Sequence, residues 1–158
     1  MPNEDEQPFK PRGRFSGITG GLALAFVMRR YKRTVPAVAE ALAARIPDVL
    51  PAEQGFKVDV DGPALDVSWQ GRAHKSGIPG FALLERGSDE QKLTRLFESE
   101  AESLQGWIRG AHRDRWPDCA FEPHVRVTRD AVHVWWGAPD ENQAPVRFRA
   151  IPRAELHL

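Results

Sequence analysis

The sequence predicts an α+β fold: a two-layer domain in which an antiparallel sheet of about five to six strands carries a long helix and an N-terminal helix on one face. Two observations lead to this prediction. Apolar residues recur at helical spacing in two segments, about 35–46 and 88–113. Apolar and polar residues alternate in paired short segments on either side of turn residues. The resulting order is helix, three strands, long helix, and two or three strands.

A chain of 158 residues is most simply one domain, since domains commonly hold about 100–150 residues. Segment 1–16 is polar, contains three prolines and lacks apolar periodicity. We therefore expect a disordered tail at 1–16, followed by a single α+β domain at 17–158.

The 22 basic residues balance 22 acidic ones, whereas a dedicated nucleic-acid-binding protein usually carries a basic excess. The single cysteine, Cys119, excludes an intramolecular disulfide and is typical of a reducing compartment, so we expect a cytoplasmic location. The longest apolar run, 18–28, is shorter than the roughly 20 residues that cross a bilayer, so no membrane span is expected. The basic residues 29–33 that follow it suggest a membrane-surface anchor as a weaker alternative.

The pattern of segment 21–33 is compatible with either a helix or a strand. Its apolar residues follow helical spacing, but residues 22–28 are apolar on both faces, as in a buried strand. Its alanines favour the helix. Thr34 as a capping residue and Pro36 in the first turn then predict a new helix from about 35 to 46, which Pro47 ends.

A hairpin follows, in which the pairing of Val60 with Leu65 places all its apolar residues on one face. Residues 70–80 resemble a loop, and the apolar run 81–85 predicts a third strand. Ser88 and Gln91 form a capping box that begins the long helix, which extends to about residue 113. Val146, Phe148 and Ala150 predict a last strand, limited by Pro152.

The most regular segment is a second hairpin at 121–136, with Arg129 and Asp130 as the central turn residues. This register pairs Val127 with Val132 and Val125 with Val134 on the core face. The opposite face then carries the polar and aromatic residues of the hairpin: Glu122, His124, Arg126, His133 and Trp135. Imidazoles, a guanidinium and an indole together suit anion or peptide binding. We predict His124, Arg126, His133 and Trp135 as partner-binding residues; the alternative is a solvated sheet face.

A second candidate surface is the basic segment Arg29, Arg30, Tyr31, Lys32 and Arg33. Its cations could contact phosphates while Tyr31 stacks on a base, which suggests nucleic-acid binding. No helix-turn-helix, zinc-finger or RNA-recognition signature accompanies it.

No catalytic residue, metal site or cofactor is predicted, because the chain contains no CxxC, HExxH, P-loop or GxSxG motif. Weaker possibilities are a cation site at the opposed Asp59 and Asp66, and a thiol at Cys119 beside His112 or His124. A small enzyme with a pocket containing His124 or His133 is the remaining catalytic alternative.

Over about residues 34–137 the element order resembles that of type III secretion chaperone-like domains, which bind protein segments and are not enzymes. The resemblance implies a protein partner. We therefore expect a non-catalytic protein-interaction or adaptor module that acts in a cytoplasmic assembly. A homodimer could form through the long helix, at Gly106 and Gly110, or through a free strand edge. The alternatives are a nucleic-acid-binding accessory protein and a small enzyme.

Overall fold

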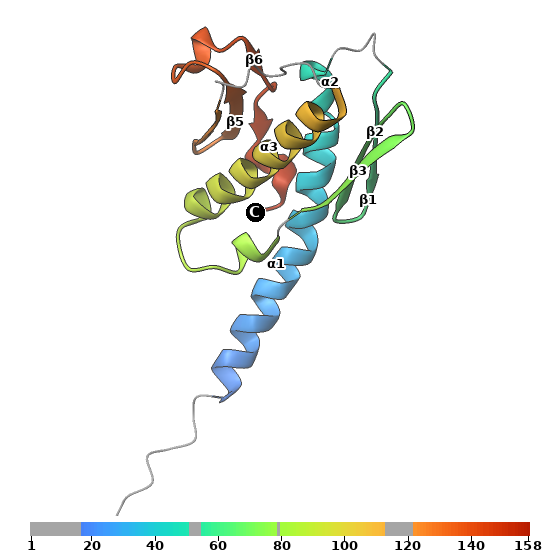
Figure 1. Ribbon diagram of the computed structural model, residues 1–158. Helices are drawn as coiled ribbons and strands as arrows, with labels where there is room; N and C mark the ends of the chain where they lie inside the picture. The colour runs from blue at the N-terminus through green and yellow to red at the C-terminus, as the bar shows by residue number, and fades with distance from the viewer. Residues whose placement is uncertain (1–16, 51–54, 79, 113–121) are drawn as a thin grey trace, which may run out of the picture.

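The computed structural model describes residues 17–50, 55–78, 80–112 and 122–158 (Figure 1). Within these residues the α+β class is confirmed by two long helices and two antiparallel sheets, of three and four strands. The strands do not join into the single sheet of five to six strands that was predicted. The predicted tail at 1–16 lies outside the described residues.

Segment 21–33 is helical, and it belongs to one long helix, α1 (Gly17–Ala43). The predicted new helix at Thr34 was wrong, because α1 runs through Thr34 and contains Pro36. Proline removes a helical hydrogen bond, but Thr34, Val35 and Val38 are fully buried there, and this packing keeps the helix continuous. A short helix, α2 (Ile46–Val49), follows with Pro47 in its first turn.

The first sheet contains β1 (Lys57–Asp61), β2 (Ala64–Trp69) and β3 (Arg72–Gly77). Val60 pairs with Leu65 as predicted. The loop predicted at 70–80 was wrong, since β3 occupies most of it. Gln70 and Gly71 both have positive φ, as a two-residue type I′ hairpin turn requires, and they return the chain alongside β2.

The strand predicted at 81–85 was also wrong, because Gly80–Leu83 forms a 3-10 helix, η2. Its backbone lies against α1, and a Cβ atom on Gly80 would be 2.2 Å from Cε2 of Tyr31. Ala82 is buried while Phe81 and Leu84 are exposed, so the apolar run does not lie in a sheet.

The capping box at the start of α3 (Asp89–His112) is confirmed. The Gln91 N–H donates to Ser88 Oγ at 3.2 Å, and the Ser88 N–H donates to Gln91 Oε1 at 3.0 Å. One apolar stripe is buried as expected, and it includes Leu93, Leu96, Phe97, Ala101, Leu104 and Ile108.

The second sheet contains β4 (Pro123–Val127), β5 (Ala131–Trp136), β6 (Val146–Arg147) and β7 (Ile151–Pro152). The β4–β5 register pairs Val127 with Val132 and Val125 with Val134, as predicted. The single last strand expected at 146–150 is replaced by β6 and β7, each two residues long and each paired with β5. Two 3-10 helices, η3 (Glu141–Gln143) and η4 (Arg153–Leu156), lie between and after them.

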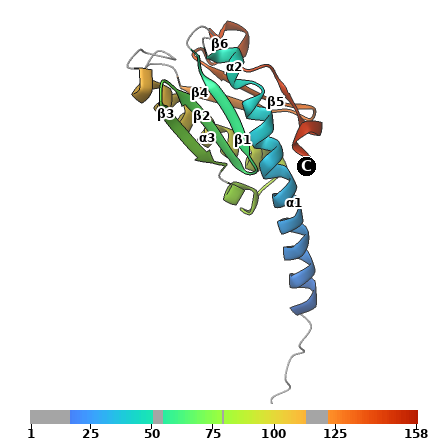
Figure 2. The ribbon, with the colours of Figure 1, turned by 90° about the vertical axis from the view of Figure 1, so that its right-hand side faces the viewer.

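Helix α3 lies between the two sheets, and α1 runs beside it (Figures 1 and 2). The C-terminal half of α1 packs against the first sheet and η4, so its residues from Thr34 onward contribute to the core. The N-terminal half projects away from the rest of the molecule in both views.

Candidate functional site

The predicted face of the second hairpin is assembled as the register indicated. His124 stacks on Trp135, with ring centroids 5.4 Å apart. The guanidinium carbon of Arg126 lies 5.9 Å from the centroid of the Trp135 ring. His133 lies opposite Arg126 on the neighbouring strand.

The segment that follows β5 covers much of this face. The Trp135 indole N–H donates to the carbonyl of Ala138 at 2.9 Å, and His124 Nε2 lies 3.2 Å from the carbonyl oxygen of Gly137. Glu141 accepts a hydrogen bond from Arg126 at 2.5 Å, and its other oxygen lies 2.9 Å from His133 Nδ1.

Trp135 is consequently only 5% exposed, although it was expected on an open face. The two histidines and Arg126 all contact residues 137–141 of their own chain. A partner at this face would compete with Glu141, and partner binding by these four residues stays a prediction.

The basic segment lies on α1, where the helix leaves the body. Arg29, Lys32 and Arg33 are exposed and form no ion pair within the described ranges. Arg30 instead donates to Asp89 at 2.7 Å, and this hydrogen bond lowers the pKa of Asp89. Tyr31 packs over Gly80, so its ring is engaged with η2 and is not presented for stacking on a base.

The most unusual surface is the apolar N-terminal half of α1. Leu22 and Phe26 are each 70% exposed and Leu24 is 61% exposed, while Val27 and Met28 are more than one-third exposed. The sequence offered a membrane-surface anchor here only as a weaker alternative, and the exposure of these side chains was not predicted. The signal was present, because residues 22–28 are apolar on both faces, but that pattern was interpreted as burial within the same chain.

Helical spacing separates these side chains into two rows. Leu24, Met28 and Tyr31 continue the row that carries Val35 and Leu42 into the core. Leu22 and Phe26 lie on the opposite side, in line with Arg29 and Arg33. The projecting half of α1 is therefore apolar around its circumference and becomes basic on one side near the body.

An open groove of about 440 Å³ lies where the projecting half meets the body. It is lined by Phe26, Arg29, Arg30, Arg33, His157 and Leu158. A smaller pocket of about 50 Å³ lies nearby, between α1, Leu83 of η2 and Leu158. The groove combines guanidinium groups with a phenyl ring, which suits a ligand that is both anionic and apolar.

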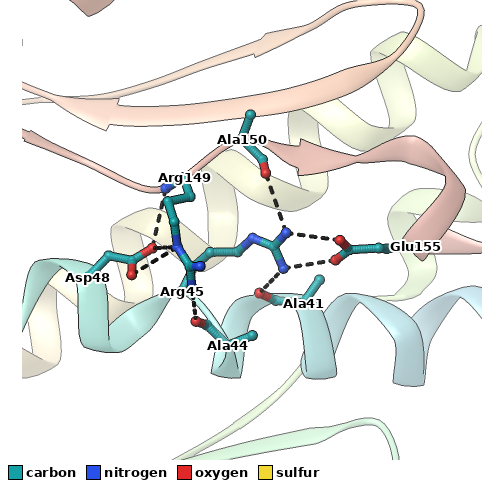
Figure 3. Close-up of polar contacts among 7 residues, drawn as sticks. All are labelled: Ala41, Ala44, Arg45, Asp48, Arg149, Ala150 and Glu155. Atoms are coloured by element: carbon teal, nitrogen blue, oxygen red, sulfur yellow. Dashed lines mark hydrogen bonds and ion pairs between the residues drawn. The ribbon is translucent and has the colours of Figure 1, made fainter.

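Polar contacts hold the other end of α1 (Figure 3). Arg45 is 8% exposed and donates to both carboxylate oxygens of Glu155, at 2.8 and 3.1 Å. The same guanidinium donates to the carbonyls of Ala41 and Ala150. We call Arg45, Glu155 and these two carbonyls the Arg45 clamp. Beside it, Arg149 binds Asp48 and the carbonyl of Ala44. These cations satisfy carbonyls that the end of a helix leaves without partners.

Other titratable groups lie between β3 and α3. Burial raises the pKa of Glu100, which accepts a hydrogen bond from Ser76 at 3.0 Å. Burial lowers the pKa of His74, whose Nε2 lies 3.3 Å from Ser103 Oγ and whose ring stacks on Trp107. These contacts join the edge strand of the first sheet to α3.

The remaining candidates from the sequence are a cation site at Asp59 and Asp66 and a thiol at Cys119. Asp59 and Asp66 face each other as expected, but the described residues contain no group of three His, Cys, Asp or Glu side chains arranged to hold a metal ion. Cys119 lies outside the described residues.

The chain matches no known protein family, no curated protein and no solved structure. None of the described helices combines the length and apolar character needed to cross a membrane.

Proposed function

We propose that this protein is a non-catalytic adaptor module and that the projecting half of α1 is its attachment element. The observation that carries the proposal is the exposure of Leu22, Leu24 and Phe26 on a helix that is held firmly at its other end. Burying one such side chain stabilises a complex by about 1.5–3 kcal/mol, so an occupant of this surface would gain substantial binding free energy.

The proposal also includes the non-catalytic role, the cytoplasmic location and the homodimer that the sequence led us to expect. The contacts of both candidate histidines with their own chain are those that a structural role at this face would produce. A cytoplasmic assembly accords with a sequence that has one cysteine. Homodimer formation through α3 remains compatible with Gly106 and Gly110, which are exposed and leave room for a neighbouring helix.

The experiment compares a tagged wild-type protein in its native host with a variant that carries Leu22→Gln, Leu24→Gln and Phe26→Gln. Glutamine keeps helix propensity while removing the apolar surface. We expect the triple variant to lose the attachments of the wild type, measured by affinity purification and by cell fractionation.

The matched control is Lys57→Gln, Arg129→Gln and Arg147→Gln, at three exposed positions away from α1 and α3. The control should behave as the wild type does. Attachments that survive in the α1 variant would refute the proposal that the projecting half of α1 is the attachment element.

A second candidate is nucleic-acid binding, which the exposed Arg29, Lys32 and Arg33 favour. It predicts salt-dependent binding that falls when these three residues are changed to Gln. The engagement of Tyr31 with Gly80 weakens the stacking component of this candidate. A small enzyme that uses His124 or His133 would instead lose its activity in His124→Ala or His133→Ala.

A further inference from the structure

We propose that the projecting half of α1 attaches to the surface of an anionic lipid membrane. Residues 21–28 would enter the interfacial region of one leaflet, and Arg29, Lys32 and Arg33 would contact lipid phosphates. This inference rests on the proposed function of α1 as the attachment element, and it names the occupant.

The distribution of apolar side chains around α1 is the first argument. Leu22 and Phe26 lie on one side of the helix, and Leu24 and Met28 lie on the other. A second helix or a protein groove covers mainly one side of a helix and would leave the other side in water. A helix that lies in the membrane interface sinks about 5–10 Å below the surface, a depth close to its own diameter, so lipid can contact it on both sides.

The length of the apolar segment is the second argument. Eight helical residues, 21–28, span about 12 Å. One leaflet contributes about 15 Å of hydrocarbon, half of a core of about 30 Å. The segment is therefore too short to cross the bilayer, and because residues 1–16 before it carry charges such as Lys10, Arg12 and Arg14, α1 would lie along the surface of one leaflet.

The charges that follow are the third argument. Arg29, Lys32 and Arg33 come directly after the apolar residues and have no acidic partner within the described ranges. Anionic lipids place phosphates at the depth where this basic group would lie. The groove lined by Phe26, Arg29 and Arg33 presents an apolar ring beside cations, as a lipid with a charged head group requires.

The apolar surface extends beyond α1. The large hydrophobic side chains that are exposed in the described part of the chain come from α1, from Phe81 and Leu84 at η2, and from Leu158. Both η2 and Leu158 adjoin α1 near the base of its projecting half. The exposed apolar residues thus gather at one end of the molecule, which is the end that would face the membrane.

The test is flotation of the purified full chain with vesicles of phosphatidylcholine, with and without phosphatidylglycerol. We expect the wild type to float with the phosphatidylglycerol vesicles. Leu22→Gln, Leu24→Gln and Phe26→Gln together should reduce partitioning by about a thousandfold or more. Arg29→Gln, Lys32→Gln and Arg33→Gln together should reduce it by about a hundredfold on the anionic vesicles.

The matched control, Lys57→Gln, Arg129→Gln and Arg147→Gln, removes the same charge from exposed sites on the two sheets and should float as the wild type does.

A shape-exchanging variant separates lipid from protein occupants. Leu22→Phe with Phe26→Leu keeps the apolar surface but changes its outline. Lipid binding should survive this exchange, whereas a fitted protein interface, including one with a second copy of the chain, should weaken. Sedimentation of the protein without lipid measures directly whether two copies of the chain form a dimer.

Three outcomes would overturn the proposal: no flotation of the wild type, flotation that is insensitive to the basic substitutions, or a stable dimer that the shape exchange dissociates. The wild type could fail to float with vesicles while the triple Gln variant of α1 loses the attachments that the wild type makes in the host. In that case the adaptor proposal stands and only the lipid occupant is rejected. If those attachments survive in that variant, the adaptor proposal itself is rejected.

Discussion

Glu141 shows how single side chains decide whether a surface is available. It binds Arg126 and His133 from two neighbouring strands, and it does so from a 3-10 helix that folds back over them. Alternation in the sequence predicted which residues share this face, and the β4–β5 register confirms that arrangement. Alternation could not predict the cover, because Asp140 begins η3 through a local turn contact that has no strand periodicity.

Glu100 provides a test at the scale of one carboxyl group. Burial raises its pKa, so the protonated form is favoured in the folded state. Its contribution to stability is therefore complete at low pH and is lost as the pH rises through the raised pKa. Glu100→Gln mimics the protonated group and should increase the free energy of unfolding at about pH 8 but not below about pH 4, where the unfolded-state carboxyl is also protonated.

Urea denaturation at both pH values measures the difference. Glu98→Gln, at an exposed position on the same helix, is the control and should change little at either pH. An effect of Glu100→Gln that is equal at both pH values would show that charge burial is not its cause.

At the scale of elements, β3 explains why some strands escape prediction. Its inward side chains, His74 and Ser76, are polar and bind Ser103 and Glu100 on α3. The strand therefore lacks the alternation of apolar residues that identified β1 and β2. Its position follows from a tight turn and from side-chain hydrogen bonds to a helix more than twenty residues away.

The contact between η2 and α1 predicts a steric effect. A Cβ atom on Gly80 would lie 2.2 Å from Cε2 of Tyr31, so Gly80→Ala should force the Tyr31 ring to move. We expect a loss of about 1–3 kcal/mol in the free energy of unfolding, measured by thermal or urea denaturation.

Gly77→Ala is the matched control, since a Cβ atom there meets nothing within 4 Å. It should retain nearly the wild-type stability. Equal stabilities of the two variants would mean that α1 and η2 are not in close contact.

At the scale of the whole molecule, the Arg45 clamp joins segments 110 residues apart. Arg45→Ala should cost about 2–4 kcal/mol, because it leaves two carbonyls without their donor and removes a nearly buried side chain from its packing. Glu155→Ala should cost only about 1 kcal/mol, since the carboxylate is partly accessible to water and Arg45 keeps its two carbonyl acceptors.

Hydrogen exchange of the amides in residues 151–156 reports whether the C-terminal segment loosens. Faster exchange in Arg45→Ala than in Glu155→Ala is expected. The reverse order would show that the Glu155 ion pair, and not the carbonyl contacts, holds this segment to α1.

The overall arrangement was only partly predictable, because some of its features depend on neighbouring residues and others on distant ones. Hairpin registers depend on adjacent residues, and these were predicted correctly for both β1–β2 and β4–β5. Whether two hairpins join into one sheet depends on what lies between them, and here that is α3. The projecting half of α1 had a readable pattern, but an apolar segment cannot indicate by itself whether its cover comes from the same chain.

The Arg45 clamp also constrains the order of events during synthesis. A ribosome produces α1 before Glu155, and at about 5–20 residues per second the intervening 110 residues take about 6–22 s. During that interval the nascent chain carries the apolar half of α1 while the contacts that fix its other half are still missing. Recruitment to a surface can therefore begin on the ribosome, before the body has folded.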